Sequence, residues 1–287
     1  MEVIDAQVHL NQLGSTEAGL AAMQAAGIDA CLIDEWDGDT PEGKWRPGVE
    51  LPNGAVRTLR TPVAEDYARR WPDKFAYYGR TEALDPDLES VMAEVLARPG
   101  CRCLRVFVPD REGALFESGG YERLFKAADR HRVPCFVWLN GKTHLLKPYV
   151  EKFPDLPFVI DHCGNGPASW PGPEVRGDAR FAGLERTYDL AAYPNVSLKW
   201  SQSVRMSAER FPFADLIPAL LRTLEHFSIS RVFWGSDYTQ LRALKRPFSW
   251  AEIHLYIQAA SALSEGDKEW LLGRGLRKLL QWPAKAQ

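Results

Sequence analysis

The sequence lacks the features that would connect the protein to a membrane or to nucleic acid. No apolar run approaches the roughly 18 residues that a membrane-spanning helix needs. The acidic N-terminus has neither the basic region nor the apolar stretch of a secretory signal. A net charge of -3 without any basic block argues against a nucleic-acid partner. These absences predict a cytoplasmic protein that acts on a small-molecule substrate.

Cysteine is too scarce and too poorly spaced to build a disulfide framework or a zinc site. The chain has an odd number of cysteines, and all lie in strand-like runs or directly after one: Cys31, Cys101, Cys103, Cys135 and Cys163. The Cys-x-Cys pair at 101 and 103 is not a zinc-binding spacing, and no second pair accompanies it. We therefore expect reduced thiols in the protein interior.

Eight apolar runs alternate with helical patterns along the 287 residues. The predicted strands are 4–10, 28–33, 75–80, 101–108, 133–139, 157–162, 196–200 and 231–235. The predicted helices are 15–26, 61–71, 85–97, 119–131, 143–152, 178–191, 213–227, 250–262 and 265–280. No glycine-rich phosphate fingerprint follows the first strand, which disfavours an open doubly wound sheet. The pattern predicts a distorted (β/α)8 TIM barrel in one domain, residues 1–287, and leaves a homodimer open.

One connection is much longer than the others. Residues 34–60 are rich in glycine, proline, aspartate and tryptophan. A connection of this length inside a compact domain is usually functional or disordered. Because it contains Trp36 and Trp45, we expect an ordered loop that acts as a lid.

Three strands far apart in the sequence each end at a histidine or an aspartate. The first contains Gln7 and His9, which share a side with Asp5 if side chains alternate. The strand at 157–162 ends at His162, and the strand at 231–235 leads to Asp237. Barrel enzymes place their chemistry at the carboxyl ends of the strands. We therefore predict one pocket lined by these residues.

The remaining strand ends supply cations and hydrogen-bonding groups: Arg80, Arg105, Trp138, Asn140 and Lys199. On the strand at 196–200, Lys199 is in phase with Ser197 and Ser201, so it should face the barrel interior. A lysine there needs a carboxylate partner, on the protein or on a ligand. Arg105 and Lys199 could therefore hold a substrate carboxylate, with Arg80 as a third cation, or pair with a core carboxylate such as Asp5 or Glu82.

These motifs together resemble the amidohydrolase superfamily. The resemblance rests on Asp5-x-x-x-His9, on Asp161-His162-Cys163-Gly164 and on Trp234-Gly-Ser-Asp237, with further similarity at Leu84-Asp85-Pro86 and in the helix at 273–280. It spans essentially the whole chain and points to the amidohydrolase-related branch, which includes pyrone-dicarboxylate lactonase and sugar lactonases. The resemblance implies that Asp237 activates water and that His162 and His9 act near the substrate carbonyl.

The sequence departs from the family pattern where a metal would bind. Gln7 stands in place of the first histidine of the pair, and the fifth strand offers Trp138 and Asn140 instead of another histidine. A neutral amide is a poor zinc ligand. We therefore expect no metal cofactor; the alternative is one zinc or manganese ion on His9, His162 and Asp237.

The resulting hypothesis is a hydrolase that opens a lactone, or a similarly activated ester, of a small carboxylate-bearing substrate. Asp237 would act as general base, and His162 with His9 and Gln7 would stabilise the developing oxyanion. Arg105, Lys199 and Arg80 would bind the substrate carboxylate, with Asn140 and Trp138 as further contacts. The alternatives are a metal-dependent decarboxylase of the same branch and a degenerate barrel that only binds its ligand.

Overall fold

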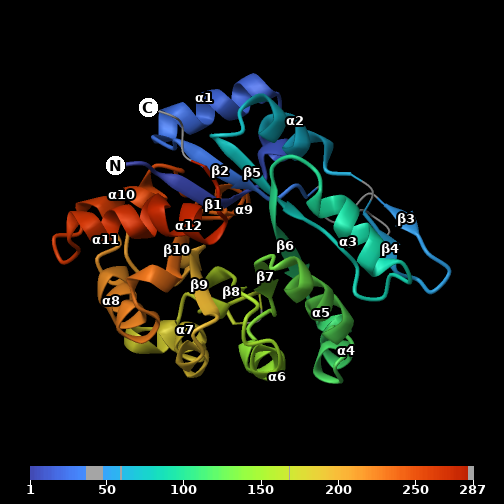
Figure 1. Cartoon of the computed structure of the whole chain (residues 1–287). Helices are drawn as coiled ribbons and strands as arrows, with labels where there is room; N and C mark the ends of the chain where they lie inside the picture. The colour runs from blue at the N-terminus through green and yellow to red at the C-terminus, as the bar shows by residue number, and fades with distance from the viewer. Residues whose placement is uncertain (37–47, 59, 168, 284–287) are drawn as a thin grey trace.

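The computed structural model describes residues 1–36, 48–58, 60–167 and 169–283. Eight parallel strands form one sheet in sequence order: β1 (Ile4–Val8), β2 (Ala30–Ile33), β5 (Phe75–Gly79), β6 (Cys101–Phe107), β7 (Cys135–Trp138), β8 (Phe158–Ile160), β9 (Val196–Ser201) and β10 (Val232–Gly235). The last strand returns beside the first, because the N–H of Asp237 donates to the carbonyl oxygen of Gln7 at 2.9 Å. The predicted TIM barrel is confirmed (Figure 1).

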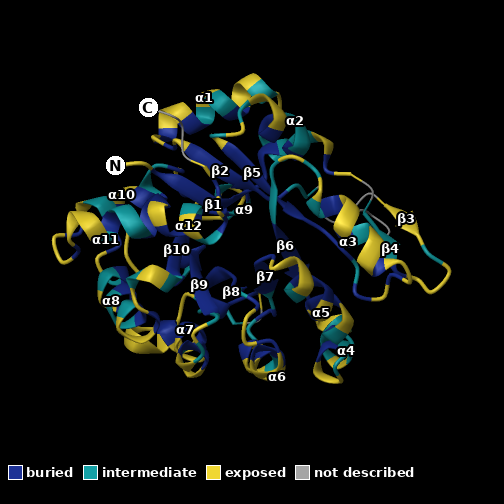
Figure 2. Ribbon diagram, in the orientation of Figure 1, coloured by how far each residue is buried: buried dark blue, intermediate teal, exposed yellow. Residues whose placement is uncertain are grey.

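Helices cover the outside of this barrel. They are α1 (Thr16–Ala26), α2 (Pro62–Arg70), α3 (Leu88–Leu96), α4 (Gly113–Glu117), α5 (Glu122–His131), α6 (Lys147–Lys152), α7 (Ala182–Glu185), α8 (Leu216–Phe227), α9 (Tyr238–Leu241), α10 (Glu252–Ala259), α11 (Glu265–Glu269) and α12 (Gly275–Leu279). Figure 2 shows buried strands inside and exposed helix faces outside. In the described part of the chain, no helix is long and apolar enough to cross a membrane.

Several predicted helices are shorter or more irregular than their sequence patterns indicated. The helix predicted at 178–191 is two 3-10 turns that flank α7. The one predicted at 265–280 is α11 and α12 joined by a π-helical turn at Trp270–Arg274. In this second helix, tertiary packing overrides the local helical pattern. The backbone lies close to the barrel there, because an added Cβ would crowd Ile4 at Gly273 and Phe233 at Gly275.

The long connection at 34–60 contains a hairpin, β3 (Val49–Glu50) and β4 (Val56–Arg57). Arg57 fixes the hairpin to the rest of the molecule by donating two hydrogen bonds of 2.6 Å to Asp85. Trp36 is described, whereas Trp45 lies outside the described residues, so the predicted lid stays a prediction.

The amino-terminal half of the barrel interior is apolar. Alternate residues of the strands meet there, including Ala6, Leu32, Tyr78, Phe136 and Val159. After α12, Leu280 and Trp282 close that end. The polar residues are therefore confined to the other end, where the strands have their carboxyl termini.

A bulge in β1 places Gln7 and His9 where they are. The register of β1 against β2 shifts between Asp5 and Val8. The apolar inner cluster contains Ala6, yet Gln7 next to it lines the cavity. Simple alternation predicted that Asp5 would share a side with Gln7 and His9, but it does not. Asp5 instead accepts hydrogen bonds from Ser236 and from Trp250 Nε1, the latter at 2.7 Å. A bulge re-aims side chains in this manner.

Candidate active site

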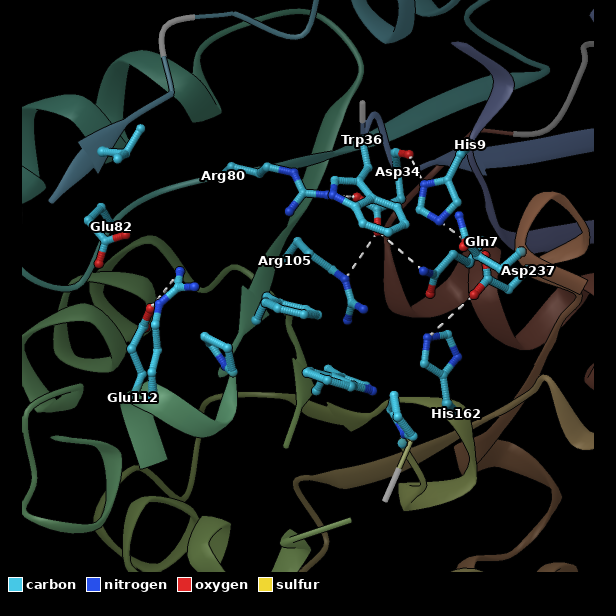
Figure 3. Close-up of a pocket in the computed structure, with 18 of the residues that line it drawn as sticks. Gln7, His9, Asp34, Trp36, Arg80, Glu82, Arg105, Glu112, His162 and Asp237 are labelled. Atoms are coloured by element: carbon cyan, nitrogen blue, oxygen red, sulfur yellow. Dashed lines mark hydrogen bonds and ion pairs between the residues drawn. The ribbon is translucent and has the colours of Figure 1, made fainter. Parts of the chain in front are cut away.

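A cavity of about 770 Å³ lies at the carboxyl ends of the strands. Figure 3 shows the side chains that converge on it. Its floor is formed by residues at the ends of strands that are far apart in the sequence, among them Gln7, His9, His162 and Asp237. The predicted common pocket of the three strands therefore exists.

Asp237 is the carboxylate at the centre of this floor. Its Oδ1 lies 3.1 Å from Nε2 of His9, and its Oδ2 lies 3.6 Å from Nε2 of His162. Oδ2 also accepts a 2.5 Å hydrogen bond from the side-chain amide of Gln202. Oδ1 receives no well-aligned hydrogen bond from the described residues. A buried carboxylate oxygen in this state can accept a proton from a ligand or from water.

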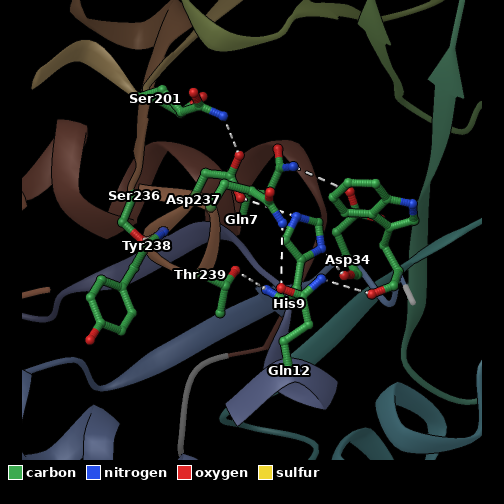
Figure 4. A network of polar contacts seen from close by, with 12 residues as sticks. Gln7, His9, Gln12, Asp34, Ser201, Ser236, Asp237, Tyr238 and Thr239 are labelled. Carbon is green, nitrogen blue, oxygen red and sulfur yellow. Dashed lines mark hydrogen bonds and ion pairs between the residues drawn. The ribbon is translucent and has the colours of Figure 1, made fainter. Parts of the chain in front are cut away.

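His9 is held as the cationic partner of Asp237. Its Nδ1 lies 2.5 Å from the backbone carbonyl oxygen of Asp34, which can only accept, so Nδ1 carries a proton (Figure 4). Burial alone would lower the pKa of His9, but Asp237 and Asp34 outweigh it and raise that pKa above 6.5. Burial likewise opposes ionisation of Asp237, yet His9, His162 and Gln202 together lower its pKa below 3.8.

His162 is neutral, unlike His9. Burial lowers the pKa of His162 well below 6.5, and the nearby Lys199 and Arg105 add to that effect against the opposing charge of Asp237. Its Nδ1 lies 2.8 Å from Oγ of Ser201. We assign the proton to Nε2, because a lone pair there would face the Asp237 carboxylate. His162 is then a neutral hydrogen-bond donor at the cavity floor.

Backbone strain coincides with these positions. The four residues that follow β7, β8, β9 and β10 at or near their ends have positive φ angles: Asn140 at 47°, His162 at 47°, Gln202 at 50° and Asp237 at 52°. A left-handed conformation is unfavourable for residues with a Cβ and is tolerated where surrounding structure enforces it. Such positions concentrate at functional sites, and here two of them, His162 and Gln202, direct their side chains at the carboxylate of a third, Asp237.

A chain of alternating charges lies beneath and beside the floor. Asp34 pairs with Arg80 and, at 3.2 Å, with Nε of Arg105. Arg105 also pairs with Asp161, whose other oxygen lies 2.5 Å from Nζ of Lys199. All five side chains are buried. Burial raises the pKa of Asp34, but Arg80 and Arg105 outweigh it and lower that pKa. Burial lowers the pKa of Lys199 well below 10.5, and Arg105 lowers it further.

Seven of the nine predicted site residues line the cavity: Gln7, His9, Arg80, Arg105, Trp138, His162 and Asp237. The other two, Asn140 and Lys199, are not among the described lining residues. Asn140 donates a 2.9 Å hydrogen bond to Asp110, and Lys199 is enclosed below the floor. The roles of these nine residues in catalysis and binding stay predictions.

The cations that were predicted to bind a substrate carboxylate already have carboxylate partners in the protein. Arg105 and Lys199 pair with Asp34 and Asp161, not with Asp5 or Glu82 as the sequence suggested. Sequence reasoning overlooked both partners. Strand alternation could have found them, because Asp34 is in phase with Leu32 and Asp161 with Val159, and both of those residues face the barrel interior.

Gln202 and Arg205 are two further residues that the sequence did not single out. Both line the cavity, and Arg205 donates to the Gln202 side-chain oxygen at 3.2 Å. This bond leaves the Gln202 amide nitrogen to face Asp237. Nothing in the local sequence after β9 distinguishes them from ordinary loop residues.

Aromatic side chains form part of the cavity wall. Trp138 stacks on Phe107 with ring centroids 4.2 Å apart, and Trp36 contacts His9 at 5.4 Å. The guanidinium of Arg205 lies 4.9 Å from the Trp170 ring. The wall therefore offers flat apolar faces next to hydrogen-bonding groups.

Comparison with known proteins decides the family. The family model described as Amidohydrolase matches residues 4–281. The chain belongs to this Amidohydrolase family. It is 27% identical over 245 residues to an L-fucono-1,5-lactonase of Burkholderia ambifaria, an alignment that covers 82% of this chain and 79% of the relative. The amidohydrolase is thus a hydrolase, as predicted.

Solved structures of similar fold support the same architecture. An amidohydrolase of Burkholderia multivorans with bound zinc has a TM-score of 0.72 at 18% identity, covering 99% of this chain and all of that one. A putative 2-pyrone-4,6-dicarboxylic acid hydrolase of Pseudomonas putida has a TM-score of 0.65 at 19% identity, covering 99% of both chains. A 5-carboxyvanillate decarboxylase of Sphingomonas paucimobilis has 0.63 at 14%, covering 98% and 99%. At these identities the amidohydrolase shares their fold.

The donor set of this amidohydrolase does not fit a divalent metal. Among the described residues, no group of three histidine, cysteine, aspartate or glutamate side chains could hold one. The oxygen of Gln7, which would have to serve as a ligand, accepts a hydrogen bond from Lys199. We therefore derive no catalytic step through a metal.

Proposed function

We propose that this enzyme hydrolyses a lactone of a small polyhydroxylated acid, with Asp237 as general base. The observation that carries the proposal is the ionised, buried Asp237, whose Oδ1 has no aligned donor and which is flanked by a cationic and a neutral histidine. The lactonase relative and the family support the same reaction class.

In the proposed reaction, a water at Asp237 Oδ1 loses a proton to the carboxylate while its oxygen attacks the ring carbonyl. Negative charge passes from Asp237 to the carbonyl oxygen, which can take over as counter-ion of the His9 imidazolium. His162 Nε2–H and a Gln7 N–H donate to that oxyanion. The ring C–O bond then breaks, and the leaving alkoxide takes the proton from Asp237, which gives the open hydroxy acid.

The lowered pKa of Asp237 makes it a weak base, which limits it to an activated substrate. A lactone meets this limit better than an amide, because its carbonyl is more electrophilic and its leaving group is easier to expel. Each oxyanion donor can contribute about 3 kcal/mol to the transition state. This balance supports ester-type chemistry at the site.

The charge of the cavity favours a neutral ring over a dicarboxylate. The described lining residues include five carboxylates and four guanidinium groups: Asp34, Glu50, Glu82, Glu112 and Asp237 against Arg80, Arg105, Arg111 and Arg205. Arg80 and Arg105 are already paired. Carboxylates and tryptophan faces suit the hydroxyl groups and C–H faces of a sugar-like ring.

The test is turnover of a panel of sugar-acid lactones, carboxylated lactones and aromatic acids by the wild type, Asp237→Asn and the exposed control Asp155→Asn. We expect neutral lactones to be opened, with a loss of roughly 1,000-fold or more in Asp237→Asn and none in the control. Opening of carboxylated lactones alone would instead support the hypothesis that Arg105, Lys199 and Arg80 bind a substrate carboxylate. Release of carbon dioxide would favour the decarboxylase, and binding without any turnover would favour the degenerate barrel.

A further inference from the structure

Lys199 is the most deeply buried cation beside the site. Its side chain has no exposure, and it extends from β9 under the cavity floor. Its Nζ has three oxygen neighbours: Asp161 Oδ1 at 2.5 Å, the Tyr78 hydroxyl at 3.2 Å and Oε1 of Gln7. The reaction proposed above gives this lysine no role.

The neighbours define the protonation state of Lys199. The Tyr78 hydroxyl donates its proton to the carbonyl oxygen of Ala6 at 2.6 Å, so it can only accept from Lys199. The carboxylate of Asp161 and the amide oxygen of Gln7 are acceptors as well. Lys199 donates to Gln7 and Tyr78 and forms an ion pair with Asp161, and this carboxylate at 2.5 Å favours the ammonium form against the effect of burial. The Tyr78 and Phe136 rings, 5.3 and 5.4 Å away, also suit a cation.

The same contacts fix the orientation of the Gln7 amide. Its Nε2 lies 3.2 Å from Oδ2 of Asp34, a group that only accepts, so the nitrogen faces Asp34 and the oxygen faces Lys199. The nitrogen carries a second N–H, and Gln7 borders the cavity next to Asp237 (Figures 3 and 4). A flipped amide would set its N–H groups against an ammonium.

We propose that Lys199 takes the place of a metal ion in this enzyme: it binds the Gln7 oxygen, so that Gln7 presents an N–H donor to the cavity instead of a metal ligand. A fixed positive charge directly behind Gln7 repels a divalent cation from the floor. The same charge polarises the amide, which strengthens its N–H as a donor to an oxyanion. Lys199 is thus a positioning residue that acts through Gln7.

The exclusion of metal can be tested without any substrate. Zinc is titrated calorimetrically into the wild type, Gln7→His, Gln7→His/Lys199→Met and Gln7→His/Lys268→Met. Lys268 is a matched control, because it is a buried lysine paired with Glu265 at 2.7 Å on α11. We expect Gln7→His/Lys199→Met to bind zinc about 100-fold more tightly than either Gln7→His or Gln7→His/Lys268→Met, because the repelling charge is gone. Equal zinc affinity of Gln7→His and Gln7→His/Lys199→Met, tight or weak, overturns the proposal.

The effect through Gln7 is tested by a double-mutant cycle, and this arm rests on the proposed lactone hydrolysis. We expect Lys199→Met to lower kcat about 100-fold with little change in KM, since an oxyanion donor acts in the transition state. Gln7→Ala/Lys199→Met should be no slower than Gln7→Ala alone. Multiplication of the two single losses would show a role independent of Gln7 and would overturn this assignment.

The design separates failure of the proposal from failure of the function or of folding. If the wild type opens no lactone, the proposed function fails, while the zinc titration still decides the role of Lys199. If Lys199→Met does not fold because Asp161 loses a partner, Lys199→Met/Asp161→Asn replaces it in both arms, because it removes both charges together. Circular dichroism and thermal unfolding confirm which variants are folded.

Discussion

His9 Nε2 lies 3.1 Å from Asp237 Oδ1, and this buried contact joins the first strand of the barrel to the last. A second bond reinforces the junction, because the backbone N–H of His9 donates to the Thr239 hydroxyl at 3.2 Å. Closing the barrel and assembling the cavity floor are therefore one structural event. Stability and activity should depend on the same ionisations.

The His9–Asp237 pair should give the protein a pH window of maximal stability. The pKa of His9 is raised above 6.5, so its contribution is complete below that pH and is lost as pH rises through the raised value. The pKa of Asp237 is lowered below 3.8, so its contribution is present above that pH and is lost as pH falls toward the lowered value. The pair therefore stabilises most between about pH 4 and 6.5.

Urea unfolding of the wild type and His9→Gln from pH 4 to 9 measures this effect. We expect His9→Gln to cost about 3 kcal/mol near pH 6 and progressively less as pH rises through the raised pKa of His9, because the wild type then loses its imidazolium. His226→Gln is the control, because His226 stacks on Tyr188 away from the cavity. A difference between wild type and His9→Gln that is constant over the whole range would contradict the ion pair.

Asp34 should be more important for stability than any surface carboxylate. Asp34 forms ion pairs with Arg80 and Arg105 and accepts a hydrogen bond from Gln7. Asp34→Ala therefore removes a carboxylate partner from two buried cations. We expect a loss of about 4 kcal/mol in the free energy of unfolding.

The control for this change is Asp66→Ala, because Asp66 also pairs with two arginines, Arg69 and Arg70, but on the surface. Exposed pairs contribute little, so its loss should stay below about 1 kcal/mol. Thermal and urea unfolding compare the two variants. Similar losses in both would show that burial does not decide the strength of these pairs.

Asp5 should stabilise the junction between β1 and β10. It accepts hydrogen bonds from the N–H of Gln7 at 3.0 Å, the N–H and hydroxyl of Ser236, and Trp250 Nε1 at 2.7 Å. Burial raises the pKa of Asp5 to about 6, so at pH 8 the carboxylate is ionised and can accept from all four donors.

We expect Asp5→Ala to cost about 3 kcal/mol at pH 8, because it leaves buried donors unsatisfied. The exposed Asp155→Ala should be neutral within about 0.5 kcal/mol. Because Ser236 precedes the proposed general base Asp237 and Gln7 is a proposed oxyanion donor, Asp5→Ala should also lower kcat. Full stability of Asp5→Ala in urea would mean that water replaces the lost carboxylate.

Metal removal is the direct test of the metal-free expectation. The protein is purified without chelator, its zinc and manganese are measured by elemental analysis, and activity is compared with and without EDTA. We expect less than about 0.1 equivalent of either metal and no loss of activity, because a neutral amide is a poor ligand and the Gln7 oxygen already accepts a hydrogen bond from Lys199. One equivalent of metal, with activity lost to EDTA, would indicate that His9, His162 and Asp237 are metal ligands. It would also favour the alternative function, a metal-dependent decarboxylase.

Sequence reasoning was reliable where a residue's role follows from its place on a strand. Periodicity located the eight strands, and strand ends then pointed to His162 and Asp237 because a barrel brings those ends together. It failed where a local irregularity decides direction. The bulge in β1 directs the side chain of Asp5 away from the side that Gln7 and His9 share, and no residue pattern in that strand predicts a bulge.

The sequence by itself determined the barrel, its family and the identity of most residues on the cavity floor, because alternation and strand order are local properties. Only the tertiary structure decided which charges meet. The sequence left Arg105 and Lys199 between a substrate carboxylate and a core partner such as Asp5 or Glu82. In the structure Asp34 and Asp161, from other strands, hold both of them, and Asp34 also holds Arg80. Ion pairs between strands depend on register and on distances of a few ångströms, and a buried charge has to find its partner in three dimensions.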